Sequence, residues 1–417
     1  MTAHAIAVSP RLRLLRRGVG ATAAQGFYSL SNLVVGITVA RSLGAAPLGH
    51  FAFLFTLLTA FVAVQTAWVG DSLTVLDRND PTVRRGLATT QWANCLVGAL
   101  AGGSIAYLAG GVGVLSAVVF ATLVAAWELE EFGRRTFMAR LEFWKQAAND
   151  GSYLVLVAVA LLAYQQLFGL TLAGTLVCMS AASLAAFVLG AAALPSEERL
   201  GLPRFSVAGL RDVARFGAWR GAQGAAGYAS QVAVRSLVIV LASAAAMGQL
   251  EAARLVVAPL FTITAASANL TLAGLSRPGA GERSGSHRRL LRVALLGLAA
   301  ISSVYAAIVL AFPAFFVHLL AGDGFAAHRL SLLGWLALAF VVAFSTPIAS
   351  LALVARRAAP VFWSRLGGSV VGLVLAAVAL AVSRSDLVPI SLGIGAAIGL
   401  VLLWPYASSP ASAEGSR

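Results

Sequence analysis

The residues of this chain best suited to chemistry are two arginines within the apolar segment 216–242. Arg220 and Arg235 are fifteen positions apart, so on an α-helix they share nearly one azimuth, about 22 Å apart along the axis. Tyr228 and Gln231 lie between them on the same face. A guanidinium group holds phosphate or carboxylate oxygens through paired, charge-assisted hydrogen bonds. The segment therefore predicts an anion-binding face, with Arg235 as its main ligand.

Each of these arginines also has a structural alternative. Arg220 lies near a helix end, where a long cationic side chain extends to the headgroups without binding a substrate. Arg235 lies deeper, and its alternative is an ion pair; the carboxylates nearest to membrane depth are Asp71 and Glu251. Both alternatives stay open on the sequence.

A second polar face is expected in the segment 18–40. Gln25, Ser29 and Asn32 follow one another at i, i+4 and i+7, which places them on one side of a helix. We expect them to line a substrate cavity together with the polar face of 216–242. The alternative is that small and polar residues at these positions only let helices pack closely.

The sequence contains no recognisable catalytic or nucleotide-binding motif. Its single lysine, Lys145, does not follow a glycine-rich loop, so a P-loop for ATP is excluded. The five histidines are scattered, and Cys95 and Cys178 fall in apolar segments without metal-ligand spacing. The sequence predicts a protein that is not an enzyme and that holds no cofactor or metal.

The elements that must position these side chains are membrane helices. Hydrophobic residues make up 59% of the 417-residue chain, charged residues only 11%, and the mean hydropathy is +0.86. Crossing a bilayer takes about 20 predominantly apolar residues. Because such segments recur along the whole chain, we expect an all-α integral membrane protein with about twelve transmembrane helices. They are expected near 18–40, 50–76, 87–109, 112–127, 151–167, 170–194, 216–242, 249–275, 290–320, 330–355, 360–383 and 387–406.

The net charge of +14 is distributed by loop, which makes it a topology signal. Arginines cluster in the N-terminal tail and in every second connection, whereas the connections between hold one arginine or none. Because Lys and Arg are retained on the cytoplasmic side, we expect a multi-pass inner (cytoplasmic) membrane protein with both termini in the cytoplasm and 41–49 outside. A basic stripe interleaved with aromatics is absent, so nucleic acid is not an expected partner. The charged segment 128–150 is expected to form an amphipathic helix at the cytoplasmic interface.

The chain divides near its middle into two similar halves. A shift of 199 residues places Gly49 on Gly248 and carries the polar face of 18–40 onto that of 216–242. The same shift places Gln65, Trp68 and Ser72 on Thr264, Ser267 and Thr271. Each half holds an even number of helices, so the halves share an orientation, and a pseudo-twofold axis along the membrane normal is expected. The expected parts are a cytoplasmic tail (1–17), an N-terminal six-helix bundle (18–194), a cytoplasmic linker (195–215), a C-terminal six-helix bundle (216–406) and a disordered tail (407–417).

Three stretches resemble one family of membrane proteins. They are "ARSLGAAPLGHFAF" (40–53), "EFGRRTFMARLEFWKQAANDG" (131–151) and "RFGAWRGAQGAAGYASQVAVRSLVI" (215–239). They are similar to the corresponding stretches of the Wzx-type polysaccharide flippases of the multidrug/oligosaccharidyl-lipid/polysaccharide (MOP) exporter superfamily. This resemblance implies two six-helix bundles around a central, often cationic cavity that opens alternately to either side. It also implies a polyprenyl-diphosphate-linked saccharide as substrate, flipped from the cytoplasmic to the outer leaflet for cell-surface polysaccharide synthesis.

The leading functional expectation is therefore a lipid-linked saccharide flippase. Its expected partners are that substrate, membrane lipids and the proteins of envelope glycan assembly. A small-solute or drug exporter of the same superfamily is the first alternative, and acidic cavity residues would favour it. A non-transporting membrane scaffold for envelope synthesis is the second, and it would tolerate the loss of Arg235.

Overall fold

The structure is a computed structural model that describes residues 10–202, 206–275, 284–354 and 357–408. Within these ranges the chain is all-helical, with fourteen α-helices. Their bounds are α1 Pro10–Leu43, α2 Ala45–Gln65, α3 Asp71–Val75, α4 Pro81–Gly110, α5 Val114–Ala139, α6 Phe143–Phe168, α7 Leu172–Ala193, α8 Val207–Leu241, α9 Ala244–Leu275, α10 Ser284–Ala311, α11 Pro313–Ala321, α12 Arg329–Val354, α13 Ala358–Ala381 and α14 Val388–Ser408. The expectation of an all-α membrane protein is confirmed.

Ten helical segments of the described residues are long and apolar enough to cross a membrane, whereas about twelve were expected. The expected span 50–76 is one of them: it comprises α2, the π-turn η1 (Thr66–Gly70) and α3. Two further helices, α1 and α5, have the length but carry polar or charged residues along it. In α1 these include Gln25 and Asn32, and in α5 they form the run from Glu128 to Arg135. In α5 most of these charged residues are buried, whereas Gln25 and Asn32 of α1 are half-buried.

The interfacial helix expected at 128–150 is wrong. Helix α5 continues to Ala139, a tight turn follows, and α6 begins at Phe143. The turn satisfies the last carbonyls of α5: the amide of Leu141 donates to the Met138 carbonyl and that of Glu142 to the Phe137 carbonyl, both at 2.9 Å. Leu141 has a φ of 59°, at a position that glycine usually occupies. Charges assigned from the sequence to one interfacial helix thus lie on two helices and on the turn between them.

Other boundaries also differ from expectation. The helix expected at 290–320 is two helices, because Pro313 lacks an amide hydrogen and begins a new helix as its first residue. Helix α1 starts at Pro10, inside the expected tail 1–17, and α8 starts at Val207, inside the expected linker 195–215. Of the expected disordered tail 407–417, residues 409–417 lie outside the described residues.

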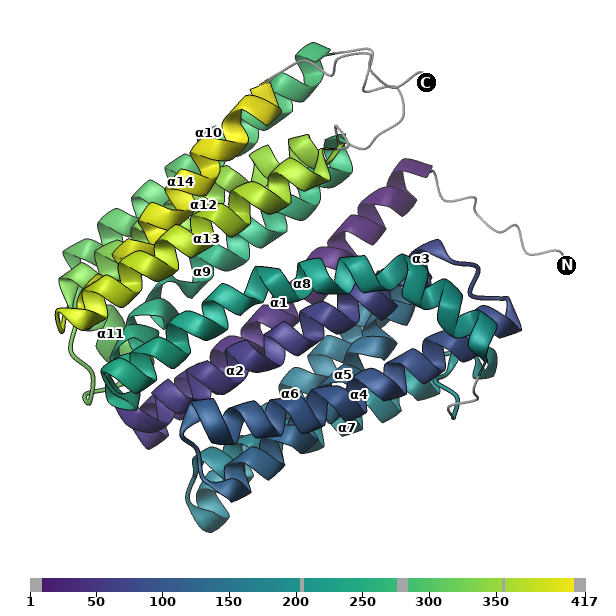
Figure 1. The fold of residues 1–417 in the computed structure, drawn as a ribbon, viewed down its shortest axis with the longest axis horizontal. Coiled ribbons are helices and arrows are strands. Elements are labelled where there is room, and N and C mark those ends of the chain that lie inside the picture. Colours follow the sequence, from purple (N-terminus) through teal and green to yellow (C-terminus); the bar gives the residue numbers. More distant parts are fainter. Residues whose placement is uncertain (1–9, 203–205, 276–283, 355–356, 409–417) are drawn as a thin grey trace, which may run out of the picture. The chain divides into compact units, whose positions relative to one another are not determined.

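The chain forms two compact units. Unit 1 comprises residues 1–35, 58–108 and 112–225, and unit 2 comprises 36–57, 109–111 and 226–417. In unit 1, α7 packs against α5 and α6. In unit 2, α14 packs against α12 and α13, and α9 against α10 and α12, so that these five helices run side by side (Figure 1).

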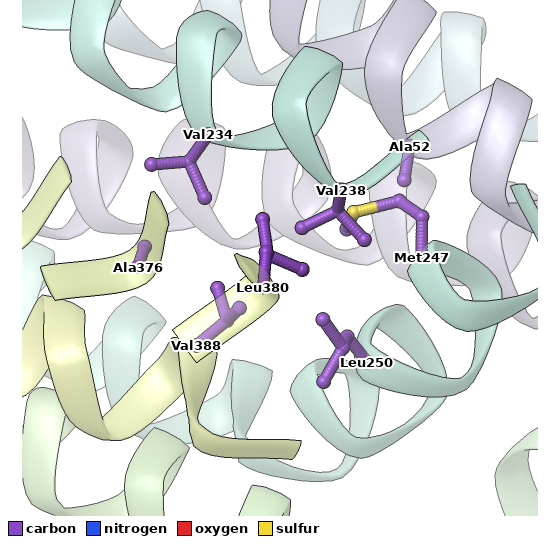
Figure 2. Packing of buried hydrophobic residues seen from close by; sticks show 8 residues of the cluster. All are labelled: Ala52, Val234, Val238, Met247, Leu250, Ala376, Leu380 and Val388. Atoms are coloured by element: carbon purple, nitrogen blue, oxygen red, sulfur yellow. The ribbon is translucent and has the colours of Figure 1, made fainter. Parts of the chain in front are cut away.

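Each unit has its own apolar core. The core of unit 1 includes Val69, Leu73, Val83, Leu87, Phe132 and Val213. The core of unit 2 joins α2, α8, α9, α13 and α14 through Ala52, Val234, Val238, Met247, Leu250, Ala376, Leu380 and Val388, whose side chains converge in Figure 2. Burying a side chain of this size stabilises a fold in water by about 1.5–3 kcal/mol, but inside lipid such cores depend on close van der Waals packing.

A glycine contact within unit 2 is reciprocal. A Cβ atom on Gly49 would collide with the carbonyl oxygen of Ala244, and one on Gly248 would collide with that of Ala45. Only glycine permits this approach of α2 to α9. The shift of 199 residues places Gly49 on Gly248 and Ala45 on Ala244. Residues that are equivalent in the two halves therefore contact each other, as happens beside a twofold axis.

Candidate functional site

The centre of the candidate site is a group of three charged residues in unit 2, of which Arg235 and Glu251 are buried and Arg254 is half-buried. Arg235 of α8 is 7% exposed, and its Nη2 lies 3.9 Å from Oε2 of Glu251 on α9. Arg254, one turn further along α9, donates to Oε1 of Glu251 from Nε at 2.8 Å and from Nη2 at 2.5 Å. Glu251 is thus held firmly by Arg254 and only loosely by Arg235.

The guanidinium of Arg235 has unused hydrogen-bonding capacity. Its Nη1 donates to the carbonyl oxygen of Gln231 at 3.3 Å, a bond within α8. Its Nε and the Oε2 atom of Glu251 are buried and have no hydrogen-bond partner among the described residues. Two cations share one carboxylate, so the group carries an excess positive charge at membrane depth. Such charges are costly and mark functional sites more often than structural ones.

The ion-pair alternative for Arg235 is realised in part, because Glu251 is its neighbour. The distance of 3.9 Å is too long for a hydrogen bond, so the pairing is electrostatic. A carboxylate that neutralises two arginines incompletely leaves room for an anionic ligand. The pairing of Arg235 with Glu251 is therefore compatible with an anion-binding role for Arg235.

Arg254 and Arg365 were not among the expected site residues. Arg254 lies within the span Ala244–Ala265, and its spacing from Glu251 in the sequence already predicts a helical ion pair. Arg365 lies within the span Ala358–Ala381 and is exposed on the surface of α13. The signal for Arg365 was a single arginine inside an apolar segment.

The remaining expected residues belong to both units. In unit 2, Tyr228 is half-buried and Gln231 is exposed, on the same helix as Arg235. In unit 1, Nε2 of Gln25 donates to Oγ of Ser29 at 3.3 Å. Asn32, one turn further on, has a buried Oδ1 without a hydrogen-bond partner among the described residues. Gln25, Ser29 and Asn32 thus lie on one helix, and their role in lining a cavity stays a prediction.

Arg220 belongs to unit 1 and has a carboxylate partner. Its Nε and Nη2 lie 2.6 and 2.5 Å from Oδ2 of Asp71, the first residue of α3. Half of the Arg220 side chain is exposed, so the pair is screened by its surroundings and contributes little to stability. Asp71, one of the two partners considered for Arg235, is thus occupied by Arg220.

The polar residues of the expected helix 50–76, Gln65 and Ser72, are buried within unit 1. Gln65 is fully buried and donates to Oε1 of Gln91 at 2.9 Å, and Ser72 donates to the Trp68 carbonyl of its own helical segment. Trp68 packs on Gly217 and Gly221 of α8. Of the equivalents in the second half, Thr264 is buried and donates to the Leu260 carbonyl, and the side chain of Thr271 lies outside the described residues. These residues act in helix packing.

A second charged cluster, in unit 1, was missed by the sequence reasoning. Arg134 of α5 donates from Nε to Oδ1 of Asp150 on α6 at 2.6 Å, and it pairs with Glu131 one turn before it. The Arg134 guanidinium also lies 4.4 Å from the ring centroid of Tyr28 on α1. Arg135 binds the other oxygen of Glu131 at 2.6 Å. The spacing of Glu131, Arg134 and Arg135 indicates helical pairs, but nothing in the sequence names Asp150 as a partner.

The same cluster contains polar groups that are not satisfied. Glu130 is buried beside Ser183 of α7 and close to Tyr153 of α6. The Oε2 atom of Glu130 and the hydroxyls of Tyr153 and Ser183 have no hydrogen-bond partner among the described residues. No group of three or more histidine, cysteine or acidic side chains that could hold a metal ion occurs among the described residues.

Comparison with known proteins shows the fold. No family model and no curated protein sequence matches the chain. Among solved structures, the lipid II flippase MurJ in an inward closed conformation has a TM-score of 0.74 at 11% identity, covering 93% of this chain and 87% of that one. An inward-facing multidrug resistance MATE family transporter has a TM-score of 0.67 at 15% identity, covering 91% and 93%. The chain has the fold of the MOP superfamily of membrane transporters.

A third structure adds a comparison of binding pockets. A MOP superfamily transporter from Pyrococcus furiosus, described as having a binding pocket of reversed polarity, has a TM-score of 0.64 at 13% identity, covering 96% of this chain and 94% of that one. The solved structures named here are transporters and not enzymes, in agreement with expectation. The MOP fold supports an arrangement of two helical bundles.

Proposed function

We propose that this protein is a flippase that moves a polyprenyl-diphosphate-linked saccharide from the cytoplasmic to the outer leaflet of the membrane. The observation that carries the proposal is the excess positive charge of Arg235, Glu251 and Arg254 inside the membrane helices of unit 2. A diphosphate supplies the missing negative charge, and its oxygens match the unused donors of Arg235. That a solved structure with this fold is a lipid II flippase supports a lipid as substrate.

The transport mechanism proposed is alternating access between two six-helix bundles, 18–194 and 216–406, related by a pseudo-twofold axis along the membrane normal. The reciprocal contact of Gly49 and Gly248 supports the internal repeat. Tyr228 and Gln231, which lie on the same helix as Arg235, assist it in holding the substrate. The other expected ligands, Gln25, Ser29, Asn32 and Arg220, stay predictions. No P-loop precedes or follows these residues, so transport is expected to be indifferent to ATP.

Flipping of a fluorescent polyprenyl-diphosphate saccharide by the purified chain in proteoliposomes tests the proposal. Loss of a charge-assisted contact worth roughly 1.5–3 kcal/mol makes Arg235→Gln about ten- to a hundredfold weaker in transport. Arg235→Lys keeps the charge without the fork and falls between. Arg384→Gln, an exposed arginine of the same unit paired with Asp386, is the matched control and should transport normally. Undiminished flipping by a stable Arg235→Gln protein would exclude the anion site, whereas absence of flipping by the wild-type protein would favour the scaffold.

One observation favours the small-solute exporter as a second candidate. Acidic residues buried in unit 1 are more numerous than the sequence suggested: Glu128, Glu130, Glu131 and Asp150 are all buried. Glu128 and Glu130 each have an oxygen without a hydrogen-bond partner among the described residues. Efflux of an organic cation dye that is lost in Glu130→Gln and kept in Arg235→Gln would favour the exporter over the flippase.

A further inference from the structure

A cavity of about 300 Å³ lies where α1 meets the beginning of α6, within unit 1. It is lined by Arg16 and Arg17 of α1, by the turn residues Leu141 and Glu142, and by Phe143, Trp144 and Lys145. None of these residues belongs to the candidate transport site. The volume is at the lower end of the range for pockets that hold small molecules.

The cavity is built by a close approach of two helices. A Cβ atom on Gly20 would lie 3.1 Å from Cβ of Phe143 and 3.3 Å from Cδ1 of Trp144, so the glycine lets α1 approach the start of α6. Nε1 of Trp144 donates to the Arg16 carbonyl at 3.1 Å and fixes the indole ring against α1. Trp144 is nevertheless 46% exposed, with one edge polar and one face apolar, as tryptophans are at membrane interfaces.

The charge in this cavity is positive. Arg16, Arg17 and Lys145 supply three cations, and Glu142 is the single carboxylate of the lining. Lys145 pairs with Glu142 at 3.0 Å, and Glu142 also accepts from Arg140 at 3.0 Å, so the excess positive charge of the lining is that of Arg16 and Arg17. The cavity also lies at the N-terminus of the 26-residue helix α6, whose dipole adds to the field. The lining is therefore complementary to an anion.

Leu141 adds an apolar side chain to the cavity, at a position whose backbone conformation disfavours residues with a Cβ atom. Its φ of 59° is a conformation that residues with a Cβ atom rarely adopt, and glycine would adopt it without strain. The Leu141 side chain is 48% exposed and lies on the cavity rim, so it gains little from packing inside the protein. Strain of this kind is typical of functional sites. An apolar side chain beside three cations fits a ligand that has both a charged group and a hydrocarbon chain.

We propose that this cavity binds the phosphate headgroup of an anionic phospholipid of the surrounding leaflet, with Arg16 and Arg17 on the phosphate and Leu141 and Trp144 against the upper acyl chains. The occupant is a bilayer lipid, held beside α1 and outside the transport site. The site does not depend on the proposed flippase activity, because its residues are separate from Arg235 and its neighbours.

Native mass spectrometry of the full chain in detergent, titrated with phosphatidylglycerol and phosphatidylcholine of equal chain length, measures the preference for the anionic lipid. Removing two cations near the headgroups lowers that preference about ten- to thirtyfold in Arg16→Gln/Arg17→Gln. The matched control, Arg85→Gln/Arg211→Gln, removes two exposed arginines of the same unit outside the cavity and should keep the preference. An equal loss in both double variants would overturn the proposal, since general surface charge would then explain the binding. If the first double variant fails to accumulate, Arg16→Gln and Arg17→Gln made singly give the same comparison.

Leu141→Gly separates a lipid role from a structural one. It relieves the backbone strain, so the lipid-free protein should be at least as resistant to heat as the wild type, while its affinity for phosphatidylglycerol falls severalfold. A Leu141→Gly protein of lower thermal stability with full lipid affinity would contradict the proposal. Glycerol 3-phosphate, which has the phosphate without the chains, should not displace phosphatidylglycerol at equal concentration. Displacement would identify a site for free phosphate and would refute the lipid assignment.

Discussion

Replacing Glu251 by glutamine is expected to destabilise the protein far more than replacing Arg235. The Glu251 carboxylate accepts two hydrogen bonds from Arg254, at 2.8 and 2.5 Å, and lies 3.9 Å from Arg235. Without it, the buried guanidinium of Arg235 and the half-buried one of Arg254 lose their shared carboxylate, which costs about 3–5 kcal/mol. Arg235→Gln leaves Glu251 paired with Arg254 and removes the bond to the Gln231 carbonyl and the distant pairing with Glu251, a loss of about 1 kcal/mol.

Thermal unfolding of the purified variants, followed by intrinsic fluorescence in detergent, measures the difference. At roughly 2–4 °C per kcal/mol, Glu251→Gln should lower the midpoint by about 10 °C and Arg235→Gln by a few degrees at most. Arg254→Gln should lie between, because Glu251 keeps only its distant partner. The exposed pair of Arg384 and Asp386 gives the baseline through Arg384→Gln. If Arg235→Gln falls as far as Glu251→Gln, Arg235 is a structural anchor and its assignment to substrate binding is wrong.

Three further predictions concern orientation, pH and packing. The orientation is tested by single cysteines in a Cys95→Ala/Cys178→Ala background, labelled with an impermeant reagent added outside intact cells. A cysteine at the exposed position Ala46 should react, and one at the exposed position Ser196 should not. The reverse result would invert the proposed topology. The hydrogen bond from Arg140 lowers the pKa of Glu142 in the folded protein. The stability that the ionised Glu142 contributes is therefore complete above the ordinary glutamate pKa, and it is lost as the pH falls through the lowered pKa of the folded protein. The thermal midpoints of wild type and Glu142→Gln should therefore differ by a constant amount from about pH 7 to about pH 5 and converge below about pH 4; convergence at neutral pH would contradict this assignment. Gly49→Ala should cost about 1–3 kcal/mol in thermal or chemical unfolding, because its Cβ meets the Ala244 carbonyl, whereas Gly227→Ala, with open space around it, should be neutral or slightly stabilising.

The sequence was sufficient to predict most helices, because apolar segments of membrane length have few other stable conformations. It failed at 128–150, where a run of charges was taken for an interfacial element. The ion pairs of Arg134 with Glu131 and Asp150 allow those charges to be buried on α5 and α6. Spacing within one helix predicts the first pair. The second joins two helices, so it depends on tertiary packing that no local pattern specifies.

The candidate site was predicted to the same extent and for the same reason. Arg235 was found because an arginine deep in an apolar segment is unusual, and Gln25, Ser29 and Asn32 because their spacing places them on one face. The partners were not assigned. Asp71 and Glu251 were both candidates for Arg235, and only the folded chain gives Asp71 to Arg220 and Glu251 to Arg235 and Arg254.

Three arginines of similar sequence context have different physical states, and the difference decides their roles. Arg220 is exposed and has a carboxylate within 2.5 Å, an arrangement that contributes little to stability. Arg134 is buried, with two carboxylates and an aromatic ring satisfying its guanidinium, so it has no capacity left for a ligand. Arg235 is equally buried, but its nearest carboxylate is shared and 3.9 Å away, and its Nε has no partner among the described residues. A buried cation persists in this state at a cost to folding, and a bound anion would offset that cost by completing its hydrogen bonds. Incomplete satisfaction, rather than burial or depth, is therefore the physical property on which the proposed substrate-binding role of Arg235 rests.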